Sequence, residues 1–139
     1  MNVARQRFLE ATVATASPAK LLTLLYDRLV LDLHRGAESF GRGDVAEGRT
    51  HTDHAQDIVT ELMDTLDVEA WPEGRRLRDV YAFLLSELLT ASTDGDAARV
   101  SACYDLVLPL AEAWREAAAA QASSPDPAGT APGGLLGVG

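Results

Sequence analysis

The stretch 15–27, which reads TASPAKLLTLLYD, contains the strongest helix-start signal in this chain of 139 residues. Ser17 is a favourable N-cap residue, because its hydroxyl can accept a hydrogen bond from an N–H group of the first turn. Pro18 falls at the first helical position, where its fixed φ suits the helix and an N–H is not needed. A helix is therefore predicted from Pro18 to Phe40, and the Gly-Arg-Gly run that follows is predicted to end it.

This predicted helix carries apolar side chains on two sides. At about 100° per residue, five large apolar residues fall within one broad arc: Leu22, Leu25, Tyr26, Leu29 and Leu33. Leu24 and Leu31 point to nearly the opposite side and form a second, narrower strip. A helix that is apolar on two sides is either deeply buried or contacts a partner with one side. The residues that precede the helix are an alternative cover for the second strip.

The same periodicity predicts a second and a third helix. Asp44 and Glu47 have the spacing of a capping box, in which the carboxylate of Asp44 accepts from early N–H groups and Glu47 reaches back. The helix that they begin is predicted to extend to about Leu66. A Trp-Pro-Glu-Gly break at 71–74 separates it from a third helix, which is predicted to extend to about Leu89.

A fourth helix is predicted from the turn at 94–96 to about Ala120, and Pro109 is expected to kink it away from the core. Residues 121–139 are rich in Pro, Gly, Ser and Ala, a composition typical of disorder. We therefore predict a helical domain of residues 1–120 and a disordered tail of residues 121–139. Because the connections are short, the predicted fold is an all-α, antiparallel up-down-up-down four-helix bundle with a short N-terminal arm.

The charge balance excludes several classes of partner. Acidic residues outnumber basic ones by 21 to 12, and the formal net charge is −9. This argues against binding to nucleic acid, which requires clustered Lys and Arg, and against an anionic membrane surface. No apolar run approaches transmembrane length, so we expect no membrane insertion. The single cysteine, Cys103, fits a reducing compartment, and a cytoplasmic protein is predicted.

The residues that could carry chemistry do not form a recognisable site. A di-metal bundle requires Glu-x-x-His pairs, which this chain lacks. His51 and His54 are three residues apart in a polar stretch and are interpreted as solvated, and the carboxylates are interpreted as lying on outward helix faces. Cys103 falls on an apolar stripe and is interpreted as a small core residue. We expect no metal, no cofactor and no catalytic activity.

Two further apolar residues lie off the predicted core stripes. Phe83 lies off the stripe of the third helix, and Ile58 lies at the margin of the stripe of the second. Each is either a contact for a partner or an ordinary exposed apolar residue, which needs no explanation.

The beginning of the first helix resembles the signature of a known family, the flagellin-specific export chaperones (FliS). That signature is a Thr-Ala-Ser-Pro turn followed by a Leu-Leu-rich helix that ends in Leu-Tyr-Asp-Gly. The matching residues here are Thr15-Ala16-Ser17-Pro18, Leu21-Leu22 and Leu25-Tyr26-Asp27. A second matching block lies at 55–63, followed by Leu66-Asp67, and Trp114 matches a tryptophan that is usual near the end of the last helix.

The resemblance covers about residues 8–117 in order, with three departures. Arg28 takes the place of the glycine after Tyr-Asp, Phe8 takes the place of an N-terminal tyrosine, and Pro109 is not expected in the family. The resemblance implies a helical bundle that binds the C-terminal segment of flagellin, prevents its premature polymerisation and delivers it to the flagellar export apparatus. As an alternative, a small helical adaptor or regulator would bind another amphipathic helix.

The predicted partner-binding residues combine the family signature with the apolar residues that lie outside the core stripes. They are Phe8, Pro18, Leu21, Leu22, Leu24, Tyr26, Leu31, Ile58, Leu62 and Phe83. The protein itself is expected to be a monomer or a weak homodimer.

Overall fold

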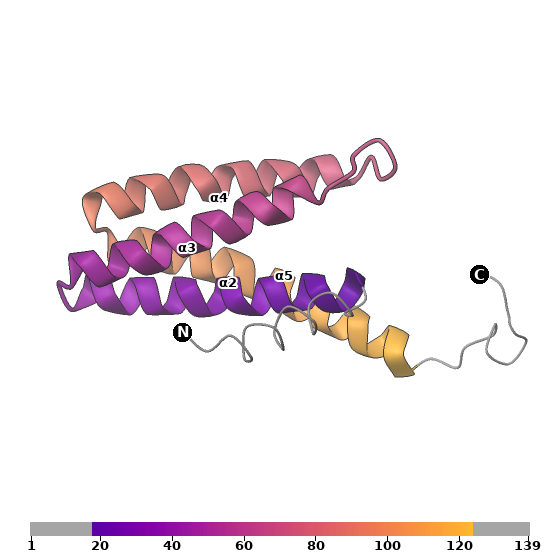
Figure 1. Ribbon diagram of the computed structural model, residues 1–139, viewed down its shortest axis with the longest axis horizontal. Coiled ribbons are helices and arrows are strands. Elements are labelled where there is room, and N and C mark those ends of the chain that lie inside the picture. Colours follow the sequence, from indigo (N-terminus) through magenta and orange to yellow (C-terminus); the bar gives the residue numbers. More distant parts are fainter. Residues whose placement is uncertain (1–17, 124–139) are drawn as a thin grey trace, which may run out of the picture.

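The computed structural model describes residues 18–123, which form four helices and no strand. The helices are α2 (Pro18–Gly41), α3 (Val45–Asp64), α4 (Gly74–Asp94) and α5 (Ala97–Ser123). Figure 1 shows that they lie side by side and that the chain turns back at each short connection. α2 packs against α3 and α5, and α4 packs against the same two helices. The predicted all-α fold with four helices is confirmed.

The first helix begins and ends where the sequence predicts. α2 starts at Pro18, and it ends at Gly41, one residue beyond the prediction. Gly43 adopts a φ of +82°, which only glycine adopts readily, and this allows the N–H of Asp44 to donate to the carbonyl oxygen of Ser39 at 2.8 Å. The segment before Pro18, with Phe8 and the predicted N-cap Ser17, lies outside the described residues.

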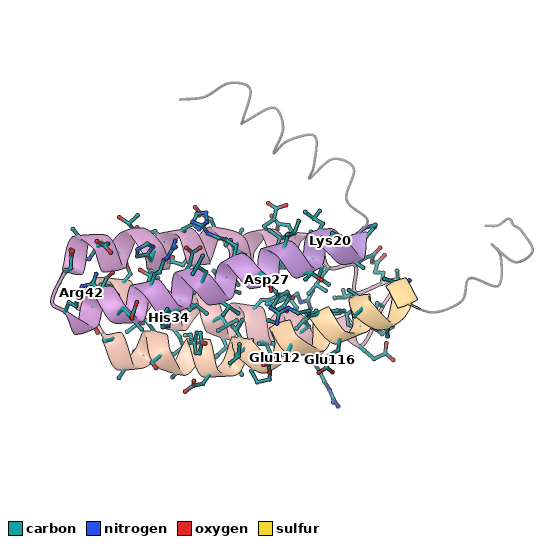
Figure 2. The ribbon with its side chains drawn as sticks, turned by 90° about the horizontal axis from the view of Figure 1, so that it is seen from below. Lys20, Asp27, His34, Arg42, Glu112 and Glu116 are labelled. Carbon is teal, nitrogen blue, oxygen red and sulfur yellow. The ribbon has the colours of Figure 1, made fainter. Side chains whose placement is uncertain are left out.

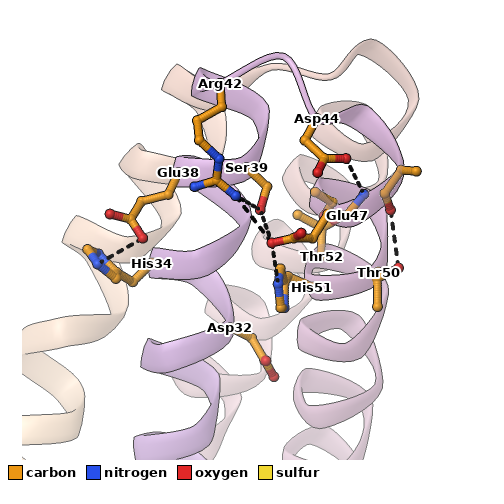
Figure 3. A network of polar contacts seen from close by, with 12 residues as sticks. Asp32, His34, Glu38, Ser39, Arg42, Asp44, Glu47, Thr50, His51 and Thr52 are labelled. Carbon is orange, nitrogen blue, oxygen red and sulfur yellow. Dashed lines mark hydrogen bonds and ion pairs between the residues drawn. The ribbon is translucent and has the colours of Figure 1, made fainter.

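The predicted capping box of α3 forms only in part. The N–H of Glu47 donates to the carboxylate of Asp44 at 3.1 Å, as expected of an N-cap. The carboxylate of Glu47 does not reach back to Asp44, because it accepts instead from the Ser39 hydroxyl at 3.0 Å and from Arg42 at 3.3 Å (Figure 3). The reciprocal bond that the spacing predicted is therefore replaced by contacts to the end of α2.

Helix α4 extends five residues beyond its predicted end, to Asp94. The hydroxyl of Thr93 donates to the carbonyl oxygen of Leu89 at 3.0 Å, so a residue that often favours turns supports the helix here. Arg49 of α3 donates to the carbonyl oxygen of Ser92 at 2.9 Å, which satisfies an acceptor near the helix end. The helix closes at Gly95, whose φ is +65°.

Helix α5 is continuous through Pro109 and extends three residues beyond its predicted end, to Ser123. Pro109 is exposed, and so is Asp105, whose carbonyl would have accepted the missing N–H, so water can satisfy that carbonyl. Figures 1 and 2 both show that the axis of α5 changes direction along its length. Figure 2 also shows Asp27 of α2, which forms an ion pair with Arg115 of α5 at 2.5 Å.

The core consists of apolar side chains from all four helices. Its largest fully buried apolar members are Tyr26, Leu29, Leu33, Val59, Leu62, Tyr81, Leu84, Leu88, Val100 and Val107. Burial of a side chain of this size contributes about 1.5–3 kcal/mol relative to leaving it in water. The core is closed near the α2–α3 turn by Phe40, which packs so tightly on Gly48 that a Cβ there would lie 2.3 Å from its ring.

One carboxylate contradicts the prediction that acidic residues lie on outward faces. Asp32 on α2 is completely buried, where it contacts the imidazole of His54 on α3 and the guanidinium of Arg28 at 3.4 Å. A buried carboxylate requires such partners, because desolvation without them costs several kcal/mol. The prediction failed because α3 approaches the polar edge of α2, and the periodicity of α2 alone does not reveal the position of its neighbour.

Candidate protein-binding groove

An apolar groove of about 430 Å³ lies between α4 and α5, near the connection that precedes α4. It is lined by Trp71 and Glu73 from the connection, by Arg76, Leu77 and Val80 from α4, and by Leu110, Ala113, Trp114 and Ala117 from α5. Its volume is within the range of about 300–1,000 Å³ that is typical of ligand sites. The wall is apolar apart from Glu73 and Arg76.

The groove is open because one of its walls carries small side chains. Ala113 and Ala117 are four residues apart and therefore lie one turn apart on the same face of α5. Their methyl groups do not reach the side chains of Leu77 and Val80 on the opposite wall in the way that two leucines would. The groove between the two helices extends along residues 76–80 of α4 and 110–117 of α5.

The two tryptophans of the chain stand at this groove, and each is held by its own contacts. Trp71 lies in the connection between α3 and α4. The Asp67 carboxylate stabilises this connection by accepting from the N–H groups of Glu69 and Ala70, at 3.1 Å in each case. Trp71 remains 44% exposed. Trp114 lies on the ring of Tyr26, with 6.3 Å between the ring centroids. Both indoles therefore present apolar surface at the groove.

Apolar surface continues beyond the groove along the same two helices. Phe83 follows Val80 by three residues and is 55% exposed, and Leu106 precedes Leu110 by four residues and is 37% exposed. Residues three or four apart share a helix face, so both extend the apolar surface by a further turn. An ion pair between Glu87 of α4 and Arg99 of α5, at 2.9 Å, bridges the two helices one turn beyond Phe83 and two turns beyond Leu106.

One groove residue, Trp114, lies beside Tyr26, which forms a buried pair with Tyr81. The hydroxyls of Tyr26 on α2 and Tyr81 on α4 lie 2.6 Å apart. Burial raises the pKa of both phenols above the ordinary value of 10, because the charged form would lose its hydration. Both groups therefore stay neutral at physiological pH. They support the groove wall through Trp114 rather than offering a charge to a partner.

The structure divides the predicted partner-binding residues into three groups. Tyr26, Ile58 and Leu62 are buried in the core and offer no surface, so the interpretation of Ile58 as a marginal, exposed residue is wrong. Its side chain is only 6% exposed because α3 is enclosed by α2 on one side and α4 on the other. Phe8 lies outside the described residues.

The remaining predicted residues are accessible to different degrees. Leu24 is 37% exposed, and Leu31 is half-buried on the same outward side of α2. Leu21 and Leu22 are also half-buried. Pro18 is exposed at a hollow of about 650 Å³ between the first turn of α2 and the last turns of α5, at the edge of the described chain.

Of the nine predicted residues that the structure describes, none lines the α4–α5 groove, and Phe83 alone extends its surface. The sequence contained a signal for the groove, which is the pair of alanines at 113 and 117 on the apolar side of α5, next to Trp114. Alanines one turn apart are also common on exposed helix faces, so the pair by itself does not predict a groove.

The titratable groups that were considered for chemistry are accounted for by packing. His51 lies 3.6 Å from Glu47 with 19% of its side chain exposed, so the interpretation of His51 as solvated is wrong. His54 is 46% exposed, as predicted, and also contacts the buried Asp32. Across residues 18–123, no group of three His, Cys, Asp or Glu side chains is placed to hold a metal ion. Burial raises the pKa of the Cys103 thiol to about 11, which leaves it a poor nucleophile.

No helix within residues 18–123 is long and apolar enough to span a membrane.

Comparison with known proteins assigns the chain to a family. The sequence model of the family described as "Flagellar protein FliS" matches residues 1–121. The chain is 30% identical over 109 residues to the flagellar secretion chaperone FliS of Salmonella typhimurium, covering 77% of this chain and 81% of that protein. It is 25% identical over 116 residues to the flagellar secretion chaperone FliS of Campylobacter jejuni, covering 83% and 91%. The apolar groove is thus found on a small helical bundle whose sequence belongs to the FliS family of flagellar secretion chaperones.

Proposed function

We propose that this protein binds the C-terminal segment of flagellin in the cytoplasm, prevents it from polymerising and delivers it to the flagellar export apparatus. The observation that carries the proposal is the apolar α4–α5 groove with its two tryptophans, on a chain that belongs to the FliS family. The groove is proposed to take one apolar face of a client helix.

The shape and chemistry of the groove support this mode of binding. An amphipathic helix binds in a groove by inserting side chains spaced three or four residues apart, each of which fills a space between host side chains. Ala113 and Ala117 leave such space, and Trp71 and Trp114 supply large, rigid apolar walls. Aromatic side chains of this kind often contribute most of the energy of an interface.

The second apolar strip on α2 is proposed as a further contact for the same client. Leu24 and Leu31 lie on the outward side of α2, away from the groove. A client segment that is disordered when free can wrap around several faces of the host, because it orders only as it binds. Ordering costs free energy, so a large contact area is compatible with moderate affinity and with release at the export apparatus.

The charge of the protein supports a role in masking an aggregation-prone segment. The net charge of −9 places like charges on each complex and opposes association between complexes. We propose that residues 1–120 form the client-binding domain and that residues 121–139 are not required for the bundle.

The test is a binding measurement with purified flagellin of the same organism and with flagellin truncated at its C-terminus. The substitution Ala113→Arg places a charged side chain in the groove, and Ala119→Arg makes the same change at an exposed alanine of α5 outside it. We expect the truncated flagellin not to bind, Ala113→Arg to weaken binding about tenfold or more, and Ala119→Arg to bind as the unmodified protein does.

Two results would contradict the proposal. If truncated flagellin binds as tightly as the full-length protein, the C-terminal segment is not the client. If Ala113→Arg retains full affinity while circular dichroism shows an intact helical fold, the client does not use the groove.

A further inference from the structure

We propose that the α4–α5 groove has a second occupant within this chain, the apolar run Leu135-Leu136-Gly137-Val138, which docks there reversibly and competes with the client. The docking itself follows from the groove and from the sequence after Ser123. Only its effect on flagellin rests on the proposed function.

The segment that follows α5 has an unusual distribution of apolar residues. Residues 124–134 consist of Pro, Gly, Ala, Ser and Thr with a single charged residue, Asp126. They are followed by two leucines and, after one glycine, a valine, with no charged residue nearby. Moving large apolar side chains out of water lowers the free energy. The groove is an open apolar surface that could cover them.

The connecting residues are long enough to return to the groove. Ala117, the groove residue nearest to the end of α5, precedes Ser123 by six positions, which corresponds to about 9 Å along a helix. Leu110, at the far end of the groove, lies about 20 Å from Ser123 by the same measure. The eleven residues 124–134 span at most about 35 Å when extended, so residues 135–138 can reach the whole groove.

Because residues 135–138 are joined to the bundle through residues 124–134, even a weak contact with the groove is formed for much of the time. A connection of this length holds its far end within a small volume around the bundle, which corresponds to a local concentration of about 1 mM. A motif of three apolar side chains with a dissociation constant near that concentration would be docked for about half of the time. Such docking is strong enough to compete with a client and weak enough to be displaced by it.

The chemistry favours residues 135–138 over the other segment outside the described structure. Residues 1–17 contain the apolar Val3, Phe8, Leu9 and Val13, but Arg5, Arg7 and Glu10 are interspersed among them. Burying one of these charges in an apolar groove would carry a large desolvation penalty. The run 135–138 fills the groove without burying any charge.

The two tryptophans make the test direct, because both line the groove and the chain contains no others. The full chain is compared with the double variant Leu135→Ser/Leu136→Ser and with a matched control, Ala128→Ser/Ala131→Ser, in the connecting residues. Without any client, we expect the leucine variant to show tryptophan emission at longer wavelength and stronger quenching by acrylamide, because the indoles lose an apolar cover. The control should match the unmodified chain.

The effect on the client is measured separately. Removing a competitor that occupies the groove for about half of the time should raise the affinity for flagellin by about twofold in the leucine variant. Unchanged fluorescence and quenching in that variant would overturn the docking. A fluorescence difference that grows with protein concentration would also overturn it, because the run would then bind to a second copy.

The two proposals can fail independently. If flagellin does not bind but the fluorescence of the leucine variant changes as described, the docking stands and the proposed function fails. If flagellin binds in the groove but the leucine variant behaves like the control, the proposed function stands and the docking fails.

Discussion

The hydroxyl of Tyr26 on α2 lies 2.6 Å from the hydroxyl of Tyr81 on α4, and this single hydrogen bond joins two helices that are not neighbours in the bundle. The ring of Tyr26 also contacts the ring of Trp114, which lines the α4–α5 groove. The position of the groove wall on α5 is therefore coupled to a polar contact inside the core.

Replacing Tyr81 with phenylalanine should destabilise the bundle by about 1–2 kcal/mol, because the hydroxyl of Tyr26 loses a buried hydrogen-bond partner. The double variant Tyr26→Phe/Tyr81→Phe should cost less than twice that amount, since neither ring then carries the hydroxyl of this pair. Urea unfolding of the two single variants and the double variant measures the coupling. Strictly additive losses would show that the bond does not contribute.

The contact between His54 and the buried Asp32 should matter more than the histidine pairs on the surface. Replacing His54 with alanine removes one of the two partners of a fully buried carboxylate, and we expect a loss of about 1–3 kcal/mol. The matched control is His34→Ala, because His34 contacts the exposed Glu38 across one helix turn and has its ring 6.0 Å from that of Tyr104. We expect that control to change the free energy of unfolding by about 0.5 kcal/mol or less. Equal losses in the two variants would contradict the assignment.

Gly48 should not tolerate alanine, although alanine has the higher helix propensity. A methyl group at this position would lie 2.3 Å from the ring of Phe40, which is itself buried and cannot easily move. We expect Gly48→Ala to lower the free energy of unfolding by about 1–3 kcal/mol. Gly41→Ala is the control, because no atom lies within 4 Å of the added methyl group there, and its stability should be unchanged or slightly higher.

The two apolar sides of α2 should respond differently to substitution. Leu29→Ala should cost about 2–5 kcal/mol of stability, since Leu29 is completely buried. Leu24→Ser/Leu31→Ser should leave the melting temperature nearly unchanged and weaken flagellin binding by about tenfold, because each side chain still has surface to bury. Paired measurements of melting temperature and affinity distinguish the two. Unfolding of the serine variant, or unchanged affinity, would remove the α2 strip from the binding surface.

The protein should lose stability at alkaline pH. Burial raises the pKa of the Cys103 thiol to about 11, above the value of about 9 in the unfolded chain, and it raises the pKa of Tyr26 and Tyr81 in the same direction. The unfolded state therefore releases protons at a lower pH than the folded state, and stability falls as the pH rises from about 9 through 11. Cys103→Ala should show a shallower decline over this range in urea unfolding. An equal slope would show that the thiol does not contribute.

Much of the fold could be predicted from the local sequence, because the residues that start and end helices act within one helical turn. Pro18 favours a helix start at any position where its N–H is not required, and Gly43 can adopt a positive φ wherever it stands. The helix ends that were misjudged depend on other helices. Thr93 and Ser92 read as turn residues, yet α4 continues through them because their carbonyl oxygens accept from Arg49 on α3.

The candidate site was harder to predict from the sequence, because a groove depends on two helices and on the distance between them. Ala113 and Ala117 are exposed, carry no distinctive signal on a helical wheel, and form the wall of a groove only in combination with the side chains of α4. Ile58 and Asp32 were misplaced for a related reason, since each lies at the edge of its own apolar stripe and is buried by a neighbouring helix.

The sequence by itself determined the four helices, their order and the family, because capping residues, glycines and apolar periodicity act locally and because the family signature is a linear pattern. Only the tertiary structure decided which faces are covered and which remain open. The spacing of the helices depends on the volumes of side chains that are distant in sequence, such as Trp71 against Ala117, and no local pattern encodes how such volumes combine.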